Sequence, residues 1–191
     1  MRGHWCYWKA QWGADWCQQV IEAALDIPFM KAEVGFYSNG TTRTDDVTRV
    51  SNIRWLNRDY KLWNDIAGEI DYYFHEANRE YYGFDVWKVR DVQFTEYEVG
   101  AHYNWHTDID WSCVMANHRK ISMTIQLSSP EDYTGGDFIL DPHCNEKPDP
   151  VEIKQQGTIL TFPSFVRHKV EPVTSGKRYC LVCWIEGPCF R

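Results

Sequence analysis

The motif His106-Thr107-Asp108, together with the distant His168, constrains the fold more than any other feature of this chain. Two imidazoles and one carboxylate leave coordination positions open on a divalent metal, an arrangement typical of non-haem Fe(II) sites. The segment 92–99 before the motif is rich in β-forming residues, and on a strand His106 and Asp108 would point to the same face. A shared site therefore requires a fold that returns a remote strand carrying His168 to the motif.

Each of these residues also has an ordinary structural interpretation. A chain with seven histidines contains an H-x-D motif by chance in roughly a third of cases. A lone histidine is more often a hydrogen-bonded core residue than a ligand, and an aspartate often caps a turn. The joint pattern of His106, Asp108 and His168 in a β-rich context favours metal ligation over these interpretations.

The sequence between and after the ligands predicts several short strands. Apolar and polar residues alternate over 121–127, the period of a half-buried strand. Stretches rich in Gly, Pro and Ser separate this segment from further β-prone runs at 137–140, 158–162, 168–173 and 177–185. Such a series of strands and turns is typical of a β-sandwich or an open barrel.

The first ninety residues are predicted to support this sheet. A strand is expected at 5–11, followed by a helix that Asp15 would cap and that buries Cys17, Val20, Ile21 and Ala24. A second helix is expected in the region 55–73, with a buried face at Leu62, Ile66, Ile70, Tyr73 and Phe74. The polar segment 38–46 is interpreted as a loop, either a solvated turn or a lid over the substrate.

Composition limits the class of protein. The net charge of −7 argues against tight, sequence-independent nucleic-acid binding, so no nucleic-acid partner is expected. No segment has the roughly 20 apolar residues of a membrane span and no signal peptide is visible, which predicts a cytoplasmic protein without membrane contact. The seven cysteines, with Cys180-Leu181-Val182-Cys183 as an isolated C-x-x-C, favour reduced, packed thiols over structural zinc.

The chain resembles the 2-oxoglutarate/Fe(II)-dependent dioxygenases, and within them the prolyl 4-hydroxylase-like branch with its microbial and phage members. The order and spacing of short motifs along nearly the whole chain carry the resemblance. These motifs are Arg49-Val50-Ser51, Phe94-Thr95-Glu96-Tyr97, Tyr103-Asn104-Trp105-His106-Thr107-Asp108, Leu127-Ser128-Ser129-Pro130, Tyr133-Thr134-Gly135-Gly136, Gly157, Phe162-Pro163-Ser164, the His168 segment 168–173, Gly176-Lys177-Arg178 and Trp184.

The resemblance implies an α+β, mainly β fold with a double-stranded β-helix (jelly-roll) core and supporting N-terminal helices. It also implies a single dioxygenase domain over 1–191. Within this domain, 1–90 would supply helical support and outer strands, and 91–191 would form the catalytic jelly-roll core.

Roles for individual residues follow from the same resemblance. His106, Asp108 and His168 would hold Fe(II) and form the catalytic centre. Arg178 would bind the distal carboxylate of 2-oxoglutarate through two parallel hydrogen bonds, assisted by Tyr97.

Three further residues are weaker candidates. Gln126 is expected in the cosubstrate pocket, at a position where some relatives carry tyrosine. Trp111 and Arg49 are expected to contact the substrate, Trp111 because the loop 109–118 follows the metal motif directly.

The implied reaction is hydroxylation of a prolyl residue in a peptide or protein, using O2 and 2-oxoglutarate and releasing succinate and CO2. Ascorbate is a candidate reductant, and the oligomeric state stays open. Asp108 argues against a halogenase, which would have a small residue there. Trp184 stands where related nucleic-acid dealkylases carry a second arginine.

Three alternatives stay open beside this reaction. The substrate could be a free amino acid or another small molecule, or the chain could be a non-catalytic metal-binding β-fold sensor. A cupin-type enzyme without 2-oxoglutarate is a further alternative. Cupin sites more often use three histidines and a glutamate, however, and they give Arg178 no role.

Overall fold

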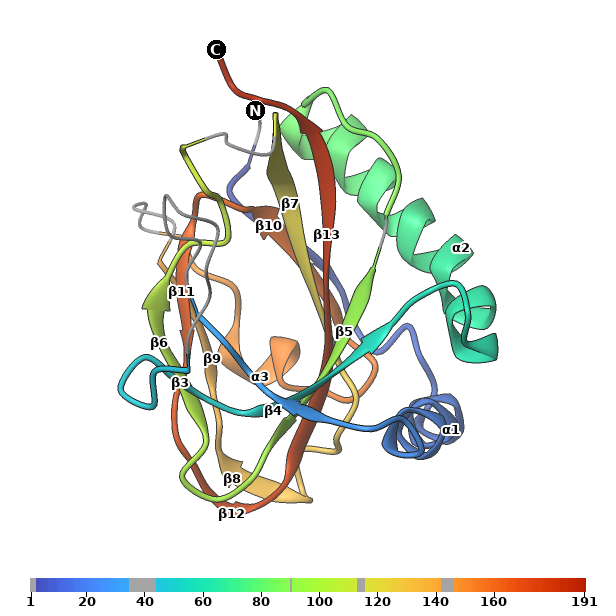
Figure 1. The fold of residues 1–191 in the computed structure, drawn as a ribbon, viewed down its shortest axis with the longest axis vertical. Coiled ribbons are helices and arrows are strands. Elements are labelled where there is room, and N and C mark those ends of the chain that lie inside the picture. The colour runs from blue at the N-terminus through green and yellow to red at the C-terminus, as the bar shows by residue number, and fades with distance from the viewer. Residues whose placement is uncertain (1–2, 35–43, 90, 113–115, 142–145) are drawn as a thin grey trace.

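The computed structural model describes residues 3–34, 44–89, 91–112, 116–141 and 146–191. A seven-stranded antiparallel sheet, in the order β1-β10-β7-β13-β5-β4-β2, faces a four-stranded sheet in the order β3-β6-β11-β9 (Figure 1). A small sheet of β12 and β8 completes the described strands. Two facing antiparallel sheets form the mainly β core that the sequence predicts.

The elements have the following bounds. The strands are β1 Cys6–Trp8, β2 Met30–Lys31, β3 Arg49–Val50, β4 Asn52–Leu56, β5 Val92–Tyr97, β6 His102–His106, β7 Asn117–Gln126, β8 Tyr133–Gly135, β9 Phe138–Asp141, β10 Ile159–Pro163, β11 Arg167–Val170, β12 Val173–Gly176 and β13 Arg178–Pro188. The helices are α1 Ala14–Leu25, α2 Lys61–Ala77, the π-helical turn Asn78–Tyr82 and α3 Pro150–Ile153.

Helices α1 and α2 cover the outer face of the seven-stranded sheet, the face away from the four-stranded sheet (Figure 1). The predicted apolar faces of both helices are buried. They pack in one cluster with strand residues that include Phe94, Ile125 and Leu181. Because helix propensity alone is weak, this shared burial is what holds the helices against the sheet.

Strand β13 runs through the centre of the seven-stranded sheet, and its two faces have different surroundings. Leu181, Cys183 and Ile185 point into the helix-covered core. The alternate residues Arg178, Cys180, Val182, Trp184 and Glu186 line a cavity between the two sheets. Side chains of a strand alternate between its faces, so a single strand serves both the core and the cavity.

Two details of the predicted helices are wrong. Trp55 lies in strand β4, because α2 begins only at Lys61 after a short turn. Asp15 does not cap α1. Its N-cap is Gly13, and Asp15 lies in the first turn, where a carboxylate still interacts favourably with the helix dipole.

The strand at 121–127 is buried on both faces, not half-buried as predicted. Its apolar face packs in the core, and its polar face, with Ser122, Thr124 and Gln126, is buried on the other side of the sheet. No helix among the described residues has the length and apolar character of a membrane span.

The cysteines also depart in part from the prediction. Cys6, Cys17, Cys180 and Cys183 are free and buried, as expected for packed thiols. Cys189 is disulfide-bonded, so the expectation of reduced thiols is wrong at this position.

Candidate metal and cosubstrate site

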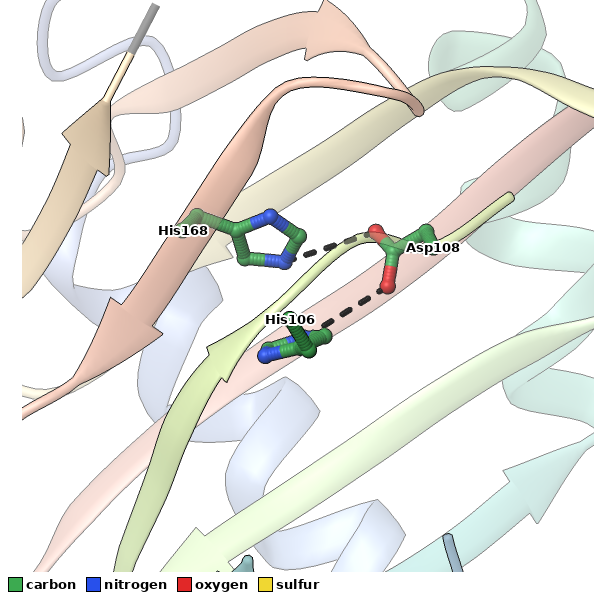
Figure 2. A group of neighbouring side chains, drawn as sticks. All are labelled: His106, Asp108 and His168. Atoms are coloured by element: carbon green, nitrogen blue, oxygen red, sulfur yellow. Dashed lines mark ion pairs between the residues drawn. The ribbon is translucent and has the colours of Figure 1, made fainter. Parts of the chain in front are cut away.

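The three predicted metal ligands converge at one end of β6 and β11, the two inner strands of the four-stranded sheet. Antiparallel pairing of β6 and β11 sets His106 directly opposite His168. Asp108 lies just beyond β6, where its backbone N–H donates to the Ser164 carbonyl at 2.9 Å. The Nε2 atoms of His106 and His168 lie 3.6 and 3.5 Å from the two carboxylate oxygens of Asp108 (Figure 2). One ligand atom from each residue lies within 4.8 Å of the others, a separation that suits a single metal ion.

Hydrogen bonds orient each ligand toward the common point. The Nδ1 atom of His106 lies 2.7 Å from the Asn104 carbonyl, and that of His168 lies 3.0 Å from the Val166 carbonyl. A carbonyl only accepts, so Nδ1 carries the proton in both rings and the Nε2 lone pairs are free to bind a metal. The Ser122 hydroxyl donates to Asp108 Oδ2 at 2.6 Å and holds the carboxylate in place.

The charges in the site suit a divalent cation. Burial alone would raise the pKa of Asp108, but the neighbouring His168 and His106 lower the pKa to about 2. Burial and the neighbouring His168 lower the pKa of His106. The site therefore offers an ionised carboxylate beside imidazole, which fits Fe(II) with coordination positions left open.

A stack of side chains supports His106 from one side. The Tyr103 ring lies 3.4 Å from the His106 ring, centroid to centroid, at an interplanar angle of 11°. The Arg49 guanidinium lies 4.5 Å from the centroid of the Tyr103 ring and donates to the Ser51 hydroxyl at 3.0 Å. The sequence predicted Arg49 but not Tyr103. A β-bulge between the pairs His168–His106 and Val170–Tyr103 puts Tyr103 beside the ligand, and regular alternation would not.

The ligands open into a cavity of about 610 Å³ between the two sheets. The cavity is also lined by Arg49, Tyr97 and Arg178. The structure therefore brings six of the eight predicted site residues around one space, the three ligands included.

Arg178 is a buried cation that lacks a carboxylate partner among the described residues. It is only 3% exposed, its guanidinium donates to Cys180 Sγ at 3.5 Å, and it lies 5.4 Å from the centroid of the Tyr97 ring. Burial works to lower the pKa of Arg178, but the neighbouring Cys180, Tyr133 and Tyr97 raise it overall. An unpaired buried charge costs roughly several kcal/mol. An anionic ligand would therefore stabilise Arg178.

The other two predicted residues do not line the large cavity. Gln126 lines a much smaller cavity of about 10 Å³ that it shares with Arg178, and it donates to the Tyr133 hydroxyl. Trp111 is 61% exposed and packs against His118 and Phe190. From the loop 109–118 that contains Trp111, Ile109 does line the cavity. Most of the polar segment 38–46, predicted as either a solvated turn or a lid over the substrate, lies outside the described residues.

Sequence reasoning missed Arg119, which also lines the cavity. Its guanidinium lies 3.8 Å from the centroid of the Trp184 ring. By simple alternation Arg119 would share the core face of Ile121. The pairing of β7 with β13 is irregular between Ile185 and Glu186, and this irregularity turns Arg119 toward the cavity. No residue pattern in the sequence marks that change of register.

Comparison with known proteins identifies the family. Residues 92–186 match the model of the 2OG-Fe(II) oxygenase superfamily, and this match contains the three ligands and Arg178. The chain belongs to the 2OG-Fe(II) oxygenase superfamily. Membership confirms the expectation of Fe(II) and 2-oxoglutarate as cofactor and cosubstrate.

The chain is also similar to individual members of this superfamily. It is similar to a PKHD-type hydroxylase of Gloeothece citriformis, with 32% identity over 100 residues that cover 52% of this chain and 44% of the relative. The chain thus aligns with less than half of the length of that curated relative.

Solved structures share its fold. A prolyl hydroxylase of Trichoplax adhaerens, in complex with a peptide fragment of the hypoxia inducible factor oxygen degradation domain, superposes with a TM-score of 0.72 at 20% identity, over 95% of this chain and 83% of that one. The viral collagen prolyl hydroxylase of Paramecium Bursaria Chlorella virus-1, in its 2OG complex, gives a TM-score of 0.68 at 18% identity, over 97% of both chains. These similarities confirm the double-stranded β-helix fold.

Proposed function

We propose that the protein is an Fe(II)- and 2-oxoglutarate-dependent dioxygenase that hydroxylates a prolyl residue of a peptide or protein. One observation carries this proposal. An open ligand set of two histidines and one carboxylate shares a cavity with Arg178, a buried cation without a carboxylate partner among the described residues. The first feature suits Fe(II), and the second suits the distal carboxylate of a dicarboxylic 2-oxoacid.

The chain's own residues bind and orient the reactants. His106, Asp108 and His168 would hold Fe(II), which when bound couples O2 and 2-oxoglutarate to substrate hydroxylation with release of succinate and CO2. Arg178 would bind the far carboxylate, with the Tyr97 ring beside it. The two sheets on either side of the cavity would limit the access of bulk water to the reacting atoms.

The lining of the cavity supports a peptidyl substrate. Trp55 and Trp184, whose ring centroids lie 6.1 Å apart, give it an aromatic wall that suits an apolar ring such as pyrrolidine. Arg119 and Arg49 add hydrogen-bond donors that suit peptide carbonyl oxygens. The peptide complex of the Trichoplax relative favours the same class of substrate. Trp111, at the surface, stays a candidate for contacts outside the cavity.

The proposal is tested with Fe(II)-loaded protein, 2-oxoglutarate and a library of proline-containing peptides. Succinate formation is measured together with an added oxygen on proline by mass spectrometry. Asp108→Ala should abolish both, and Asp59→Ala, which removes an exposed carboxylate remote from the cavity, should leave both unchanged. Oxygen added to free proline but to no peptide would redirect the proposal to small molecules. Absence of succinate with every substrate would favour a non-catalytic sensor.

A further inference from the structure

The segment Tyr133-Thr134-Gly135-Gly136 has no role in the function proposed so far, yet it packs directly against Arg178. Tyr133 opens strand β8 and is only 3% exposed. Its hydroxyl accepts a hydrogen bond from Gln126, a residue that lines a small cavity together with Arg178, and it interacts with the Arg178 guanidinium.

Gly136 brings the two side chains together. A Cβ atom at this position would lie 3.2 Å from Arg178 Cδ and 3.3 Å from Tyr133 Cε2. It would also lie 2.9 Å from Val173 Cγ2, closer than real Cβ atoms approach, and the residue has a φ of +60°. Only glycine therefore fits here, and its lack of a side chain lets the Tyr133 ring and the Arg178 stem share one site.

Gln126 fixes the direction of the hydrogen bonds at Tyr133. Its Nε2 atom lies 3.1 Å from the Ser128 carbonyl oxygen and 3.0 Å from the Tyr133 hydroxyl. The carbonyl can only accept, so the amide nitrogen must face it, and the same nitrogen then donates to the phenol oxygen. The Tyr133 oxygen thus acts as an acceptor, the role that a neighbouring guanidinium requires.

We propose that Tyr133 is the positioning residue of the cosubstrate site: its phenol oxygen, held by Gln126, fixes the Arg178 guanidinium toward the distal carboxylate of 2-oxoglutarate. This inference rests on the proposed function. A neutral acceptor orients the cation without neutralising it, whereas a carboxylate at the same place would compete with the ligand. In agreement, the neighbouring Tyr133 helps to raise the pKa of Arg178.

The test compares two ligands of the Mn(II)-loaded protein by calorimetry. One ligand is 2-oxoglutarate, and the other is 2-oxopentanoate, which keeps the metal-binding 2-oxoacid group but has a methyl group in place of the distal carboxylate. Tyr133→Phe should weaken 2-oxoglutarate binding by about tenfold or more, the loss expected for one hydrogen bond to a charged group, and leave 2-oxopentanoate binding unchanged. Tyr179→Phe is the matched control, because Tyr179 points from β13 to the helix-covered face.

A second variant guards against a purely structural effect. Gln126→Met removes the amide donor but keeps the side-chain length, so it should show the same selective loss in smaller degree. Unchanged 2-oxoglutarate binding in Tyr133→Phe would overturn the assignment, and so would an equal loss of both ligands. If the unmodified protein does not prefer 2-oxoglutarate to 2-oxopentanoate, the proposed function itself fails, an outcome distinct from the first two.

Discussion

Replacing Arg178 with methionine should stabilise the ligand-free protein while it weakens cosubstrate binding. The guanidinium is 3% exposed and has no carboxylate partner among the described residues. Removing this charge from water costs roughly several kcal/mol, as for other buried ions. The contacts with Cys180 and Tyr133 offset only part of that cost. Methionine fills a similar volume without the charge, so we expect a gain of about 1–2 kcal/mol in the free energy of unfolding.

The same substitution should weaken 2-oxoglutarate binding by roughly thirty-fold or more. The variant loses a charge-assisted pair of hydrogen bonds in a semi-enclosed pocket, and this pair is worth about 2–4 kcal/mol. Metal binding should not change, because Arg178 is not one of the three candidate ligands. Urea unfolding of the metal-free protein and calorimetry of the Mn(II)-loaded protein measure the two effects separately.

Arg54 provides a matched control for this prediction. It is also buried, at 6% exposure, but its guanidinium pairs with Glu96 at 3.0 Å. Arg54→Met should therefore destabilise the protein by up to about 3 kcal/mol, because Glu96 loses its buried partner and keeps only Lys177, at 3.1 Å. If Arg178→Met destabilises the protein as much as Arg54→Met does, an internal group already pairs with Arg178. Unchanged 2-oxoglutarate affinity would exclude Arg178 from the cosubstrate site.

Three further substitutions test other parts of the site and fold. Asp108→Ala should abolish tight Fe(II) binding with an unchanged circular dichroism spectrum, since it removes the only anionic ligand; undiminished succinate production would exclude it as a ligand. Trp111→Ala should impair substrate hydroxylation but spare iron and 2-oxoglutarate binding, with slow succinate formation persisting; normal hydroxylation would assign Trp111 to the scaffold. Burial would raise the pKa of Glu96, but hydrogen bonds from Arg54 and Lys177 lower it overall. Ionised Glu96 therefore stabilises the fold above its unfolded pKa of about 4.3, and this stabilisation is lost as pH falls through its lower folded pKa. Glu96→Gln should flatten that acid limb in urea unfolding, and an unchanged slope would refute the assignment.

The part of the site that was predictable from the sequence rests on local chemistry and regular alternation. His106, Asp108 and His168 stood out as a ligand set, and they meet because two short strands pair in register. Arg178 was predicted from the resemblance, and it lies in the same cavity. Their roles in catalysis stay predictions until the variants are measured.

The residues that were missed depend on irregular pairing or on distant contacts. Tyr103 and Arg119 reach the cavity through β-bulges, which no period-2 pattern reveals. Tyr133 was visible only as part of a turn-rich motif. Its link to Arg178 depends on the approach of β8 and β13 around Gly136, a contact between strands that are not neighbours in any sheet.

Because β13 has two faces, substitutions can change substrate specificity without changing the stability of the fold. Val182, Trp184 and Glu186 shape the space that a substrate would occupy, whereas Leu181, Cys183 and Ile185 hold the helices to the sheet. A substitution on the first face changes which molecule fits, and a substitution on the second changes how much folded protein a cell retains. A lineage could thus acquire new substrates by altering every second residue of one strand, without passing through poorly folded intermediates.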